Sequence, residues 1–199
     1  MVGPNGTIRM RVTSGRYKGR NIRAPKDLSA RPTTDFAKQA LFNILQHSVP
    51  MEGIRVLDLF AGTGAISLEF LSRGAEEVIC VDNDEKAFRH LQRSARDAQI
   101  DNWRLVRADA LTYLRNAPGP FDIVFADPPF TMEGVENIPT LVQMSGVLAP
   151  DGLFVLEHSR DVKTENLPGF VKHRDYGTVH FSFFRSIHNS TPDLSGQNT

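Results

Sequence analysis

The sequence predicts an α/β fold in which a doubly wound, mostly parallel sheet ends in an antiparallel hairpin and follows a small basic extension. After residue 51, short apolar runs alternate with amphipathic segments, the pattern of parallel strands that helices cover on both faces. A glycine-rich turn directly follows the first apolar run, as in doubly wound sheets that bind ligands. Only a short turn around Gly177 separates the last two β-prone segments, which indicates an antiparallel hairpin.

The extension is expected over residues 10–50. Residues 10–23 contain short β-prone pieces on either side of two glycines, so they predict a β-hairpin. Apolar residues at helical spacing predict an amphipathic helix over residues 34–47, with Thr34 or Thr33 as its N-cap. The basic hairpin and this helix together precede the main domain.

The main domain is expected over residues 51–186, whereas residues 1–9 and 187–199 are expected to be flexible ends. Its predicted strands are 54–60, 77–81, 103–107, 121–126 and 153–157, followed by the hairpin strands 170–175 and 178–185. Its predicted helices run from the glycine turn to about residue 73 and over 85–98, 109–115 and 134–147. Each strand is an apolar run, and each helix has polar residues along one face.

Composition favours one packed domain inside the cell. The chain has 199 residues, of which 40% are hydrophobic, enough for a single core with modest extensions. Its one cysteine, Cys80, cannot form an intramolecular disulfide, which fits the reducing cytoplasm. The first ten residues lack the apolar part of a secretory signal, and no run approaches the roughly 20 apolar residues that span a bilayer. We therefore expect a cytoplasmic monomer that contacts no membrane and, because no Cys/His cluster is visible, holds no metal.

The N-terminal segment is strongly basic although the formal net charge of the chain is zero. Residues 1–31 carry eight lysines and arginines against one acidic residue, Asp27. Such an asymmetry indicates an arm that binds a polyanion, with a solvated basic tail as the alternative. The candidates for RNA phosphate contacts are Arg11, Arg16, Lys18 and Arg20.

Residues 56–64 have the pattern of a strand with an acid near its end, a glycine turn and the start of a helix. A dinucleotide site needs a third glycine so that a pyrophosphate can rest on the helix N-terminus, but Ser67 occupies that position. Asp58 would repel a pyrophosphate and suits a cationic amino-acid group instead, such as that of S-adenosylmethionine. The residues expected to contact this cofactor are Asp58, Phe60, Ala61, Gly62 and Gly64.

Two further acids follow the next two predicted strands. Asp82 comes about 20 residues after the glycine turn, where a carboxylate can accept hydrogen bonds from both ribose hydroxyls. Asp109 is expected to accept one from the adenine amino group, with Asn83 and Ala110 lining the ring. Taken singly, each acid fits a helix cap equally well, but three acids at three successive strand ends favour a cofactor site.

The tetrapeptide Asp127-Pro128-Pro129-Phe130 follows the fourth predicted strand. An exocyclic amino group is a poor nucleophile because its lone pair is delocalised into the ring, and two acceptors aimed at its hydrogens localise that lone pair. The Asp127 carboxylate and the Pro128 carbonyl are the predicted acceptors, in a loop that two prolines stiffen, and Phe130 is predicted to stack on the base. An ordinary turn is the alternative interpretation of this motif alone.

With these motifs the chain resembles the RsmD family of small-subunit rRNA guanine-N2 methyltransferases, whose Rossmann-like class I methyltransferase fold has a seven-stranded sheet. The resemblance runs from about residue 10 to residue 185, and its markers are residues 11–20, 31–35, 40–43, 58–64, 127–130 and 157–158. It implies methyl transfer from S-adenosylmethionine to the 2-amino group of one guanine in 16S rRNA, with S-adenosylhomocysteine as product and an assembled or partly assembled small subunit as substrate. It also implies that Arg31 and Thr33 lie beside the cofactor and the target base. Asp82 departs from the family's glutamate at the ribose position, although either carboxylate can serve.

Three other functions stay open at this point. An adenine-amino (N6) methyltransferase of RNA or DNA shares the Asp-Pro-Pro-Phe motif. A nicotinamide-dependent oxidoreductase shares the glycine turn and is opposed by Ser67. A non-catalytic RNA-binding protein could retain the whole fold.

Overall fold

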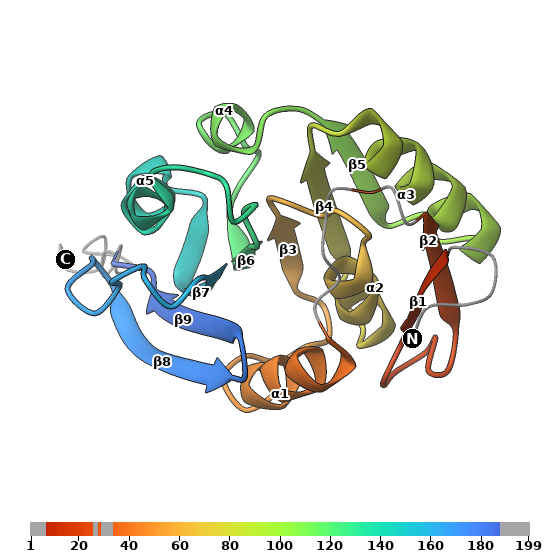
Figure 1. Cartoon of the computed structure of the whole chain (residues 1–199), viewed down its shortest axis with the longest axis horizontal. Coiled ribbons are helices and arrows are strands. Elements are labelled where there is room, and N and C mark those ends of the chain that lie inside the picture. Colours follow the sequence, from red (N-terminus) through yellow and green to blue (C-terminus); the bar gives the residue numbers. More distant parts are fainter. Residues whose placement is uncertain (1–6, 26–27, 29–33, 188–199) are drawn as a thin grey trace, which may run out of the picture.

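The computed structural model describes residues 7–25, 28 and 34–187. These residues form a seven-stranded sheet and a separate two-stranded hairpin (Figure 1). The order of strands in the large sheet is β5-β4-β3-β6-β7-β9-β8. The bounds of these strands are β3 Arg55–Asp58, β4 Glu77–Asp82, β5 Trp103–Arg107, β6 Phe121–Ala126, β7 Leu148–His158, β8 Phe170–Tyr176 and β9 Val179–Arg185.

The large sheet is doubly wound. Neighbouring strands from β5 to β7 run parallel, whereas β9 is antiparallel to both β7 and β8. The chain moves outward from β3 to β5 and then returns to place β6 on the other side of β3. This topology confirms the predicted mostly parallel sheet with a closing antiparallel hairpin. It also places a switch point between β3 and β6, where ligands bind beyond the carboxyl ends of the strands.

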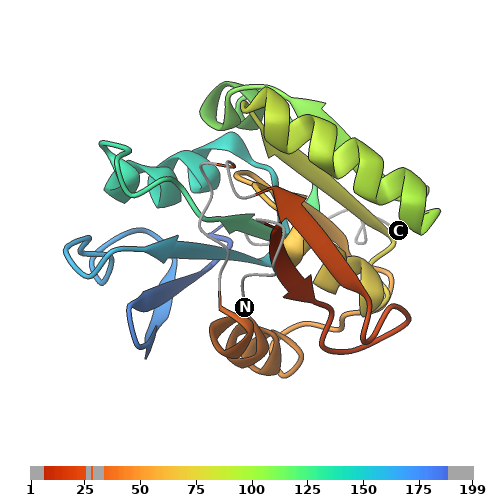
Figure 2. The same ribbon diagram turned by 45° about the vertical axis from the view of Figure 1, so that its right-hand side comes forward.

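Helices cover both faces of the sheet (Figures 1 and 2). The helices α1, α2 and α3 pack on the face that carries Val56 and Phe125, and α4 and α5 pack on the face that carries Leu57 and Val124. Among the described residues no helix is long and apolar enough to cross a membrane. The bounds are α1 Asp35–Leu45, α2 Ala65–Ser72, α3 Glu85–Ala98, α4 Ala110–Leu114, the 3-10 helix η1 Val135–Asn137 and α5 Ile138–Ser145.

The structure confirms the predicted order of elements and changes several of their boundaries. The Thr34 hydroxyl accepts a hydrogen bond from the backbone N–H of Ala37 and so caps α1, as predicted. Strand β7 begins well before the predicted residue 153, because Leu148 pairs with Phe121 ahead of an irregularity in the ladder. Residues 134–147 consequently hold η1 and the short α5 instead of one continuous helix.

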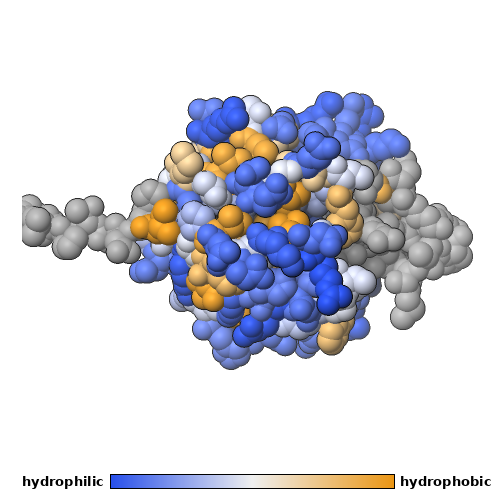
Figure 3. Space-filling view, turned by 60° about the vertical axis from the view of Figure 1, so that its left-hand side comes forward, coloured by the Kyte–Doolittle hydropathy of each residue, from blue (hydrophilic) through white to orange (hydrophobic). Residues whose placement is uncertain are grey.

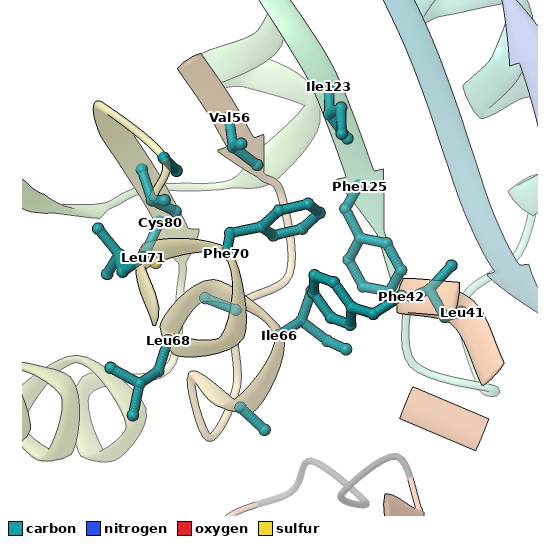
Figure 4. Close-up of a cluster of buried hydrophobic side chains, with 14 of the residues drawn as sticks. Leu41, Phe42, Val56, Ile66, Leu68, Phe70, Leu71, Cys80, Ile123 and Phe125 are labelled. Carbon is teal, nitrogen blue, oxygen red and sulfur yellow. The ribbon is translucent and has the colours of Figure 1, made fainter. Parts of the chain in front are cut away.

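A cluster of buried side chains joins α1 and α2 to the sheet. The rings of Phe42 in α1 and Phe70 in α2 have centroids 4.7 Å apart in an edge-to-face arrangement. Figure 4 shows the ring of Phe125, from β6, pointing toward the same cluster. All three rings are buried, and such burial fixes both helices relative to the end of β6.

The surface turned toward the viewer in Figure 3 mixes small hydrophobic areas with hydrophilic side chains. The large hydrophobic side chains that are exposed among the described residues are Phe36, Phe130, Met144, Val171 and Ile187. Hydrophobic residues scattered in this way are normal on a folded protein. Phe130 belongs to the predicted reactive loop.

The basic hairpin docks on α2 through one buried carboxylate. Its strands are β1 (Thr7–Arg11) and β2 (Asn21–Pro25), and β1 begins before the predicted boundary at residue 10. Glu69 of α2 is fully buried and accepts hydrogen bonds from the backbone N–H of Thr13 and of Ser14, at 2.9 and 3.1 Å. It also accepts one from the Thr13 hydroxyl at 2.6 Å. The backbone of the hairpin is thereby held against the helix.

Two cations balance the charge of Glu69. The Lys38 ammonium lies 3.5 Å from the Glu69 carboxylate and is itself buried, and Arg73 Nε donates to that carboxylate at 3.0 Å. Lys38 also donates to the Arg11 carbonyl. The hairpin, α1 and α2 therefore share one buried ion network, and removing one member leaves the others uncompensated.

We predict that Glu69→Gln lowers the free energy of unfolding by about 3 kcal/mol, because the buried Lys38 loses its nearer carboxylate and, among the described residues, keeps only Asp35, 3.9 Å away. Amide exchange over residues 12–20 should also accelerate, since the hairpin loses its best acceptor. Urea unfolding and hydrogen-exchange mass spectrometry measure the two effects. The control is Glu133→Gln, at an exposed position. Equal stability of the two variants would contradict this role of Glu69.

Candidate active site

Three carboxylates meet where neighbouring strands end at the switch point. Asp58 of β3 lies beside Phe125 of β6, and Phe125 lies beside Val155 of β7. Asp127 and Glu157 each come two residues later, on the same face of the sheet, because side chains alternate along a strand. The predicted meeting of Asp58 and Asp127 is thus present in the fold, and Glu157 joins them.

Asp58 is buried and its hydrogen bonding is incomplete. Its Oδ2 accepts a hydrogen bond from the Ser67 hydroxyl, whereas its Oδ1 has no partner among the described residues. Burial raises the pKa of Asp58 from 3.8 to about 7; the Ser67 hydrogen bond opposes this rise and the charge of Asp82 adds to it. A buried acceptor without a donor is uncommon because it costs the desolvation of that group. Asp58 Oδ1 can therefore accept a hydrogen bond from a ligand, or from a residue outside the described ranges, or contact a cation.

A buried chain of polar contacts holds Ser67 in position. Its Oγ lies 2.7 Å from Cys80 Sγ, and Trp103 Nε1 donates to the same sulfur at 2.8 Å. Burial raises the pKa of the Cys80 thiol well above its usual value, in keeping with an inert buried thiol. Ser67 thus stands where a dinucleotide site has glycine because its hydroxyl orients the Asp58 carboxylate.

The two predicted glycines of the turn act differently. Gly62, with φ of 49°, donates its N–H to Asp82 Oδ2 at 2.7 Å and so joins the ends of β3 and β4. Gly64 has φ of 77°, and a Cβ there would lie 2.4 Å from Leu91 and 2.8 Å from Trp103. Gly64 is therefore required by the turn and by close packing of α3 and β5. Its contact with a cofactor stays a prediction.

The acids that follow β4 and β5 accept hydrogen bonds from the backbone. Asp82 accepts from the N–H groups of Gly62 and Asp84 at 2.7 and 2.8 Å, and burial raises its pKa. Asp109 caps α4 by accepting from the N–H of Thr112 at 2.8 Å, and hydrogen bonds from Thr112 lower its pKa. A carboxylate can accept about four hydrogen bonds. Both acids keep capacity for a ligand, and their contacts with ribose and adenine stay predictions.

The other predicted lining residues differ in exposure. Ala61 and Ala110 are buried, Phe60 is partly exposed and Asn83 is exposed. The exposed position of Asn83, directly after β4, leaves its side chain accessible to a ligand. Arg31 lies outside the described residues.

Asp127 lies in a field of negative charge. Burial raises the pKa of Asp127 well above its usual value, and the charges of Glu157 and Asp58 raise it further. Each carboxylate at these adjacent strand ends disfavours ionisation of its neighbours, whereas a nearby positive charge favours it. The residues present therefore fit a ligand that carries a sulfonium or ammonium group better than one that carries a phosphate.

The loop after Asp127 leaves an acceptor and an aromatic ring accessible. The Pro129 carbonyl accepts a hydrogen bond from the N–H of Met132 at 2.8 Å, which closes a turn. The Pro128 carbonyl has no donor among the described residues, so it can accept one from a ligand. The side chain of Phe130 is 60% exposed. Both groups are accessible, and their roles as second acceptor and stacking surface stay predictions.

The predicted RNA-binding side chains are exposed, but they lie away from this loop. They are Arg11, Arg16, Lys18 and Arg20. The guanidinium carbons of Arg16 and Arg20 lie 5.6 and 5.5 Å from the centre of the Tyr17 ring. The backbone N–H of Arg16 donates to the carbonyl of Ser72, the last residue of α2, and Arg20 donates to the carbonyl of Ala98, the last residue of α3. Because α2 and α3 lead away from the carboxyl edge of the sheet, the basic turn and the Asp-Pro-Pro-Phe loop lie at different ends of these helices.

The sequence does not assign a role in the site to Glu157 or to the Ser67 hydroxyl. Glu157 ends an apolar strand just as Asp58 does, so the same pattern of strand-end acids could have identified it. The hydrogen bond from Ser67 to Asp58 depends on where α2 lies against β3, which no local pattern encodes. Thr33, which the resemblance places beside the cofactor, lies outside the described residues.

Comparison with known proteins agrees with this geometry. A family model described as "Conserved hypothetical protein 95" matches residues 10–185. The Escherichia coli (strain K12) protein "Ribosomal RNA small subunit methyltransferase D" is 33% identical to this chain over 159 residues, which cover 79% of this chain and 79% of that protein. The family model therefore spans the basic turn, the glycine turn and the Asp-Pro-Pro-Phe loop.

Solved structures show the same fold. The Thermus thermophilus hypothetical protein TTHA0928 is 28% identical, with a TM-score of 0.76, and the match covers 88% of this chain and 98% of that one. The T. thermophilus 16S rRNA N2 G1207 methyltransferase RsmC, solved in complex with AdoMet and guanosine, is 22% identical, with a TM-score of 0.70. That match covers 90% of this chain and 50% of RsmC. These neighbours confirm the predicted Rossmann-like class I methyltransferase fold.

We predict that Asp58→Asn becomes more stable relative to the wild type as pH rises from 4 to 8. A folded-state pKa near 7 means that the folded protein binds more protons than the unfolded chain between pH 4 and 7, so ionised Asp58 costs stability above that range. The relative gain should approach about 4 kcal/mol. Urea unfolding of both proteins at pH 4 and pH 8 measures it.

The control for this prediction is Asp109→Asn. The folded-state pKa of Asp109 is lowered, so this variant should lose stability relative to the wild type as pH rises through the acid range. A pH-independent difference between Asp58→Asn and the wild type would contradict the raised pKa of Asp58.

Proposed function

Because the chain belongs to the RsmD family of rRNA methyltransferases, whose model is described as "Conserved hypothetical protein 95", we propose that it methylates the 2-amino group of a guanine in 16S rRNA. S-adenosylmethionine supplies the methyl group from a sulfonium, and S-adenosylhomocysteine is the product. The observation that carries this proposal is the pair of strand-end carboxylates Asp58 and Asp127, both with raised pKa values. Family membership sets aside the nicotinamide-dependent oxidoreductase.

The residues of this chain divide the binding of the methyl donor among them. Asp58 Oδ1, which lacks a partner among the described residues, is proposed to accept the ammonium group. Asp82 accepts the ribose hydroxyls and Asp109 the adenine amino group, on the capacity that their backbone contacts leave. The other proposed contacts are Arg31, Thr33, Phe60, Ala61, Gly62, Gly64, Asn83 and Ala110.

Asp127 and Pro128 are proposed to act on the target base. The Asp127 carboxylate and the Pro128 carbonyl accept hydrogen bonds from the exocyclic amine and localise its lone pair toward the donor. Pro129 keeps the carbonyl direction fixed, and Phe130 stacks on the base, which is worth roughly 1–3 kcal/mol. Positioning and electrostatics supply the acceleration, so no strong general base is required. The proton leaves after the amine has been alkylated and has become more acidic.

The proposed substrate, a guanine in 16S rRNA, is supported by similar proteins and by the basic hairpin. The E. coli relative is named for the small ribosomal subunit, and the RsmC structure is titled as an N2 methyltransferase of G1207 in 16S rRNA. The basic hairpin at the far ends of α2 and α3 suits a large RNA, such as an assembled or partly assembled subunit, that reaches both the arm and the loop. We further propose that the protein acts as a monomer in the cytoplasm.

An adenine-amino methyltransferase is the competing function, because the acceptor pair fits either exocyclic amine. The decisive experiment compares ribosomal RNA from cells with and without this protein, digested to nucleosides and analysed by mass spectrometry. Loss of one N2-methylguanosine in 16S rRNA is expected on deletion. Loss of a methyladenosine with unchanged methylguanosine would show that the methylated base is adenine and not guanine.

We predict that Asp127→Ala lowers the rate of methyl transfer at least about 100-fold, the size of effect seen when a transition-state hydrogen-bond partner is removed. Affinity for S-adenosylmethionine should change only a few-fold, because Asp127 faces the amine rather than the donor. Single-turnover transfer and calorimetry measure the two quantities. Asp161→Ala, at an exposed position, is the control. Near-normal turnover in Asp127→Ala would remove the proposed mechanism.

We predict that replacing Arg16, Lys18 and Arg20 together by glutamine weakens RNA binding and flattens its dependence on salt. Each lost phosphate contact should reduce the slope of log K against log salt by about 0.7–0.9. The control replaces Arg16 and Arg20 by lysine, which keeps the charge and should keep the slope. An unaltered slope in the glutamine variant would exclude the arm from phosphate binding.

A further inference from the structure

A second cluster of titratable side chains lies on the closing hairpin, outside the proposed active site. His173 and Asp175 are two residues apart on β8 and therefore share one face of the sheet. On β9, His180 pairs with Asp175 and Ser182 pairs with His173. On β7, His158 pairs with His180 from the other side. Three strands thus bring three histidines and one carboxylate together on one face.

Three of these side chains offer convergent ligand atoms. His173 Nε2 and His180 Nδ1 each lie 2.5 Å from Asp175 Oδ1. The three atoms all lie within 4.8 Å of one another, and the rings of the two histidines stack with centroids 5.6 Å apart. The His180 side chain is 9% exposed and that of Asp175 is 60% exposed. The cluster is therefore anchored in the protein and open to solvent on one side.

The buried Ser182 hydroxyl orients this cluster from behind. Its Oγ lies 3.0 Å from His173 Nδ1, 2.8 Å from His158 Nε2 and 2.7 Å from Thr164 Oγ1. Ser182 and Thr164 are fully buried. The contact with His173 Nδ1 fixes the ring so that Nε2 faces Asp175. In metal sites a ligating histidine is commonly held in this way through its second nitrogen.

A second histidine holds Ser182 in place. The Ser159 carbonyl accepts a hydrogen bond from His158 Nδ1 at 2.8 Å, and His158 Nε2 lies 2.8 Å from the Ser182 hydroxyl. His158 and His173 therefore share one buried hydroxyl, and His173 Nε2 faces the Asp175 carboxylate at 2.5 Å. Imidazole nitrogens and carboxylate oxygens are atoms that bind metal ions in proteins.

We propose that His173, Asp175 and His180 bind a divalent transition-metal ion, and that zinc(II) is the ion that fits best. Two imidazole nitrogens and one carboxylate oxygen suit zinc, whereas calcium and magnesium prefer oxygen ligands. Three protein ligands leave the fourth tetrahedral position to water, in keeping with the exposed side of Asp175. The rings already lie in place, and small shifts would open the 2.5 Å contacts to the spacing of zinc ligands.

This ion would clamp the end of the β8–β9 hairpin. The next residue pair, Tyr176 and Val179, adjoins the turn, and the Tyr176 ring meets Phe36 of α1 with centroids 6.1 Å apart. Figure 1 shows this end of β8 beside α1. The site is separate from the methyl-transfer residues and does not depend on the proposed function. The expectation that no metal is bound rested on spacing along the sequence, and only the hairpin register brings these three residues together.

The test uses the full chain without a polyhistidine tag, stripped of metal by a chelator that is then removed. Calorimetric titration with zinc chloride is expected to show one saturable site per chain. Titration with cobalt(II) chloride is expected to give the visible bands of a four-coordinate ion. His180→Ala should weaken zinc binding at least about tenfold, and Ser182→Ala about tenfold through loss of the outer hydrogen bond. His47→Ala, which removes an exposed histidine, is the matched control and should bind zinc as the wild type does.

Two results would overturn the proposal. One is the absence of saturable zinc binding by the wild-type chain, a measurement that does not depend on any variant folding. The other is equal zinc affinity of His180→Ala, His47→Ala and the wild type. In either case the three side chains form a hydrogen-bonded cluster that binds no metal ion.

Discussion

The crowding of carboxylates at the switch point is the constraint on which the rest of the site depends. Asp58, Asp127 and Glu157 end three adjacent strands on one face. Burial raises the pKa of Asp58 and of Asp127, and the charges of Glu157 and Asp58 raise that of Asp127 further. Such an arrangement costs folding free energy unless a cation offsets it. Ser67, Cys80 and Trp103 form the buried chain that orients Asp58, so part of the core serves to hold a charge in an unfavourable place. A binding site for a cationic methyl donor explains why that cost is retained.

The basic hairpin is attached to the main domain by a different kind of contact. Its backbone donates to the buried Glu69 carboxylate, while Lys38 and Arg73 balance the charge. These contacts involve main-chain groups and leave the basic side chains of the turn exposed. The hairpin is therefore held against α2 by its backbone, and its basic side chains remain exposed. Because it lies at the far end of α2 from the reactive loop, an RNA that engages both must extend along that side of the protein.

The sequence predicts the elements that local patterns encode. Alternating strands and helices, the closing hairpin and the Thr34 cap all follow from periodicity and capping chemistry, and the acids at strand ends follow from the topology that this periodicity implies. The sequence does not predict contacts that arise only from tertiary packing. Gly64 is required by Leu91 and Trp103, which are distant in sequence, and Glu69 looks like any helical glutamate until the hairpin covers it. The histidine cluster depends on the register between β8 and β9, which no spacing rule supplies.

The central claim is that buried carboxylates of the switch point are matched to a cationic methyl donor. Calorimetric binding of S-adenosylmethionine at pH 5, 6 and 7, in pairs of buffers with different heats of ionisation, tests it most directly. Because a bound cation lowers the pKa of a nearby carboxyl, binding at pH 6 should release protons and the affinity should rise toward pH 7. Proton release should be smaller in Asp58→Asn. Affinity that is independent of pH, with no proton released at pH 6, would contradict the claim.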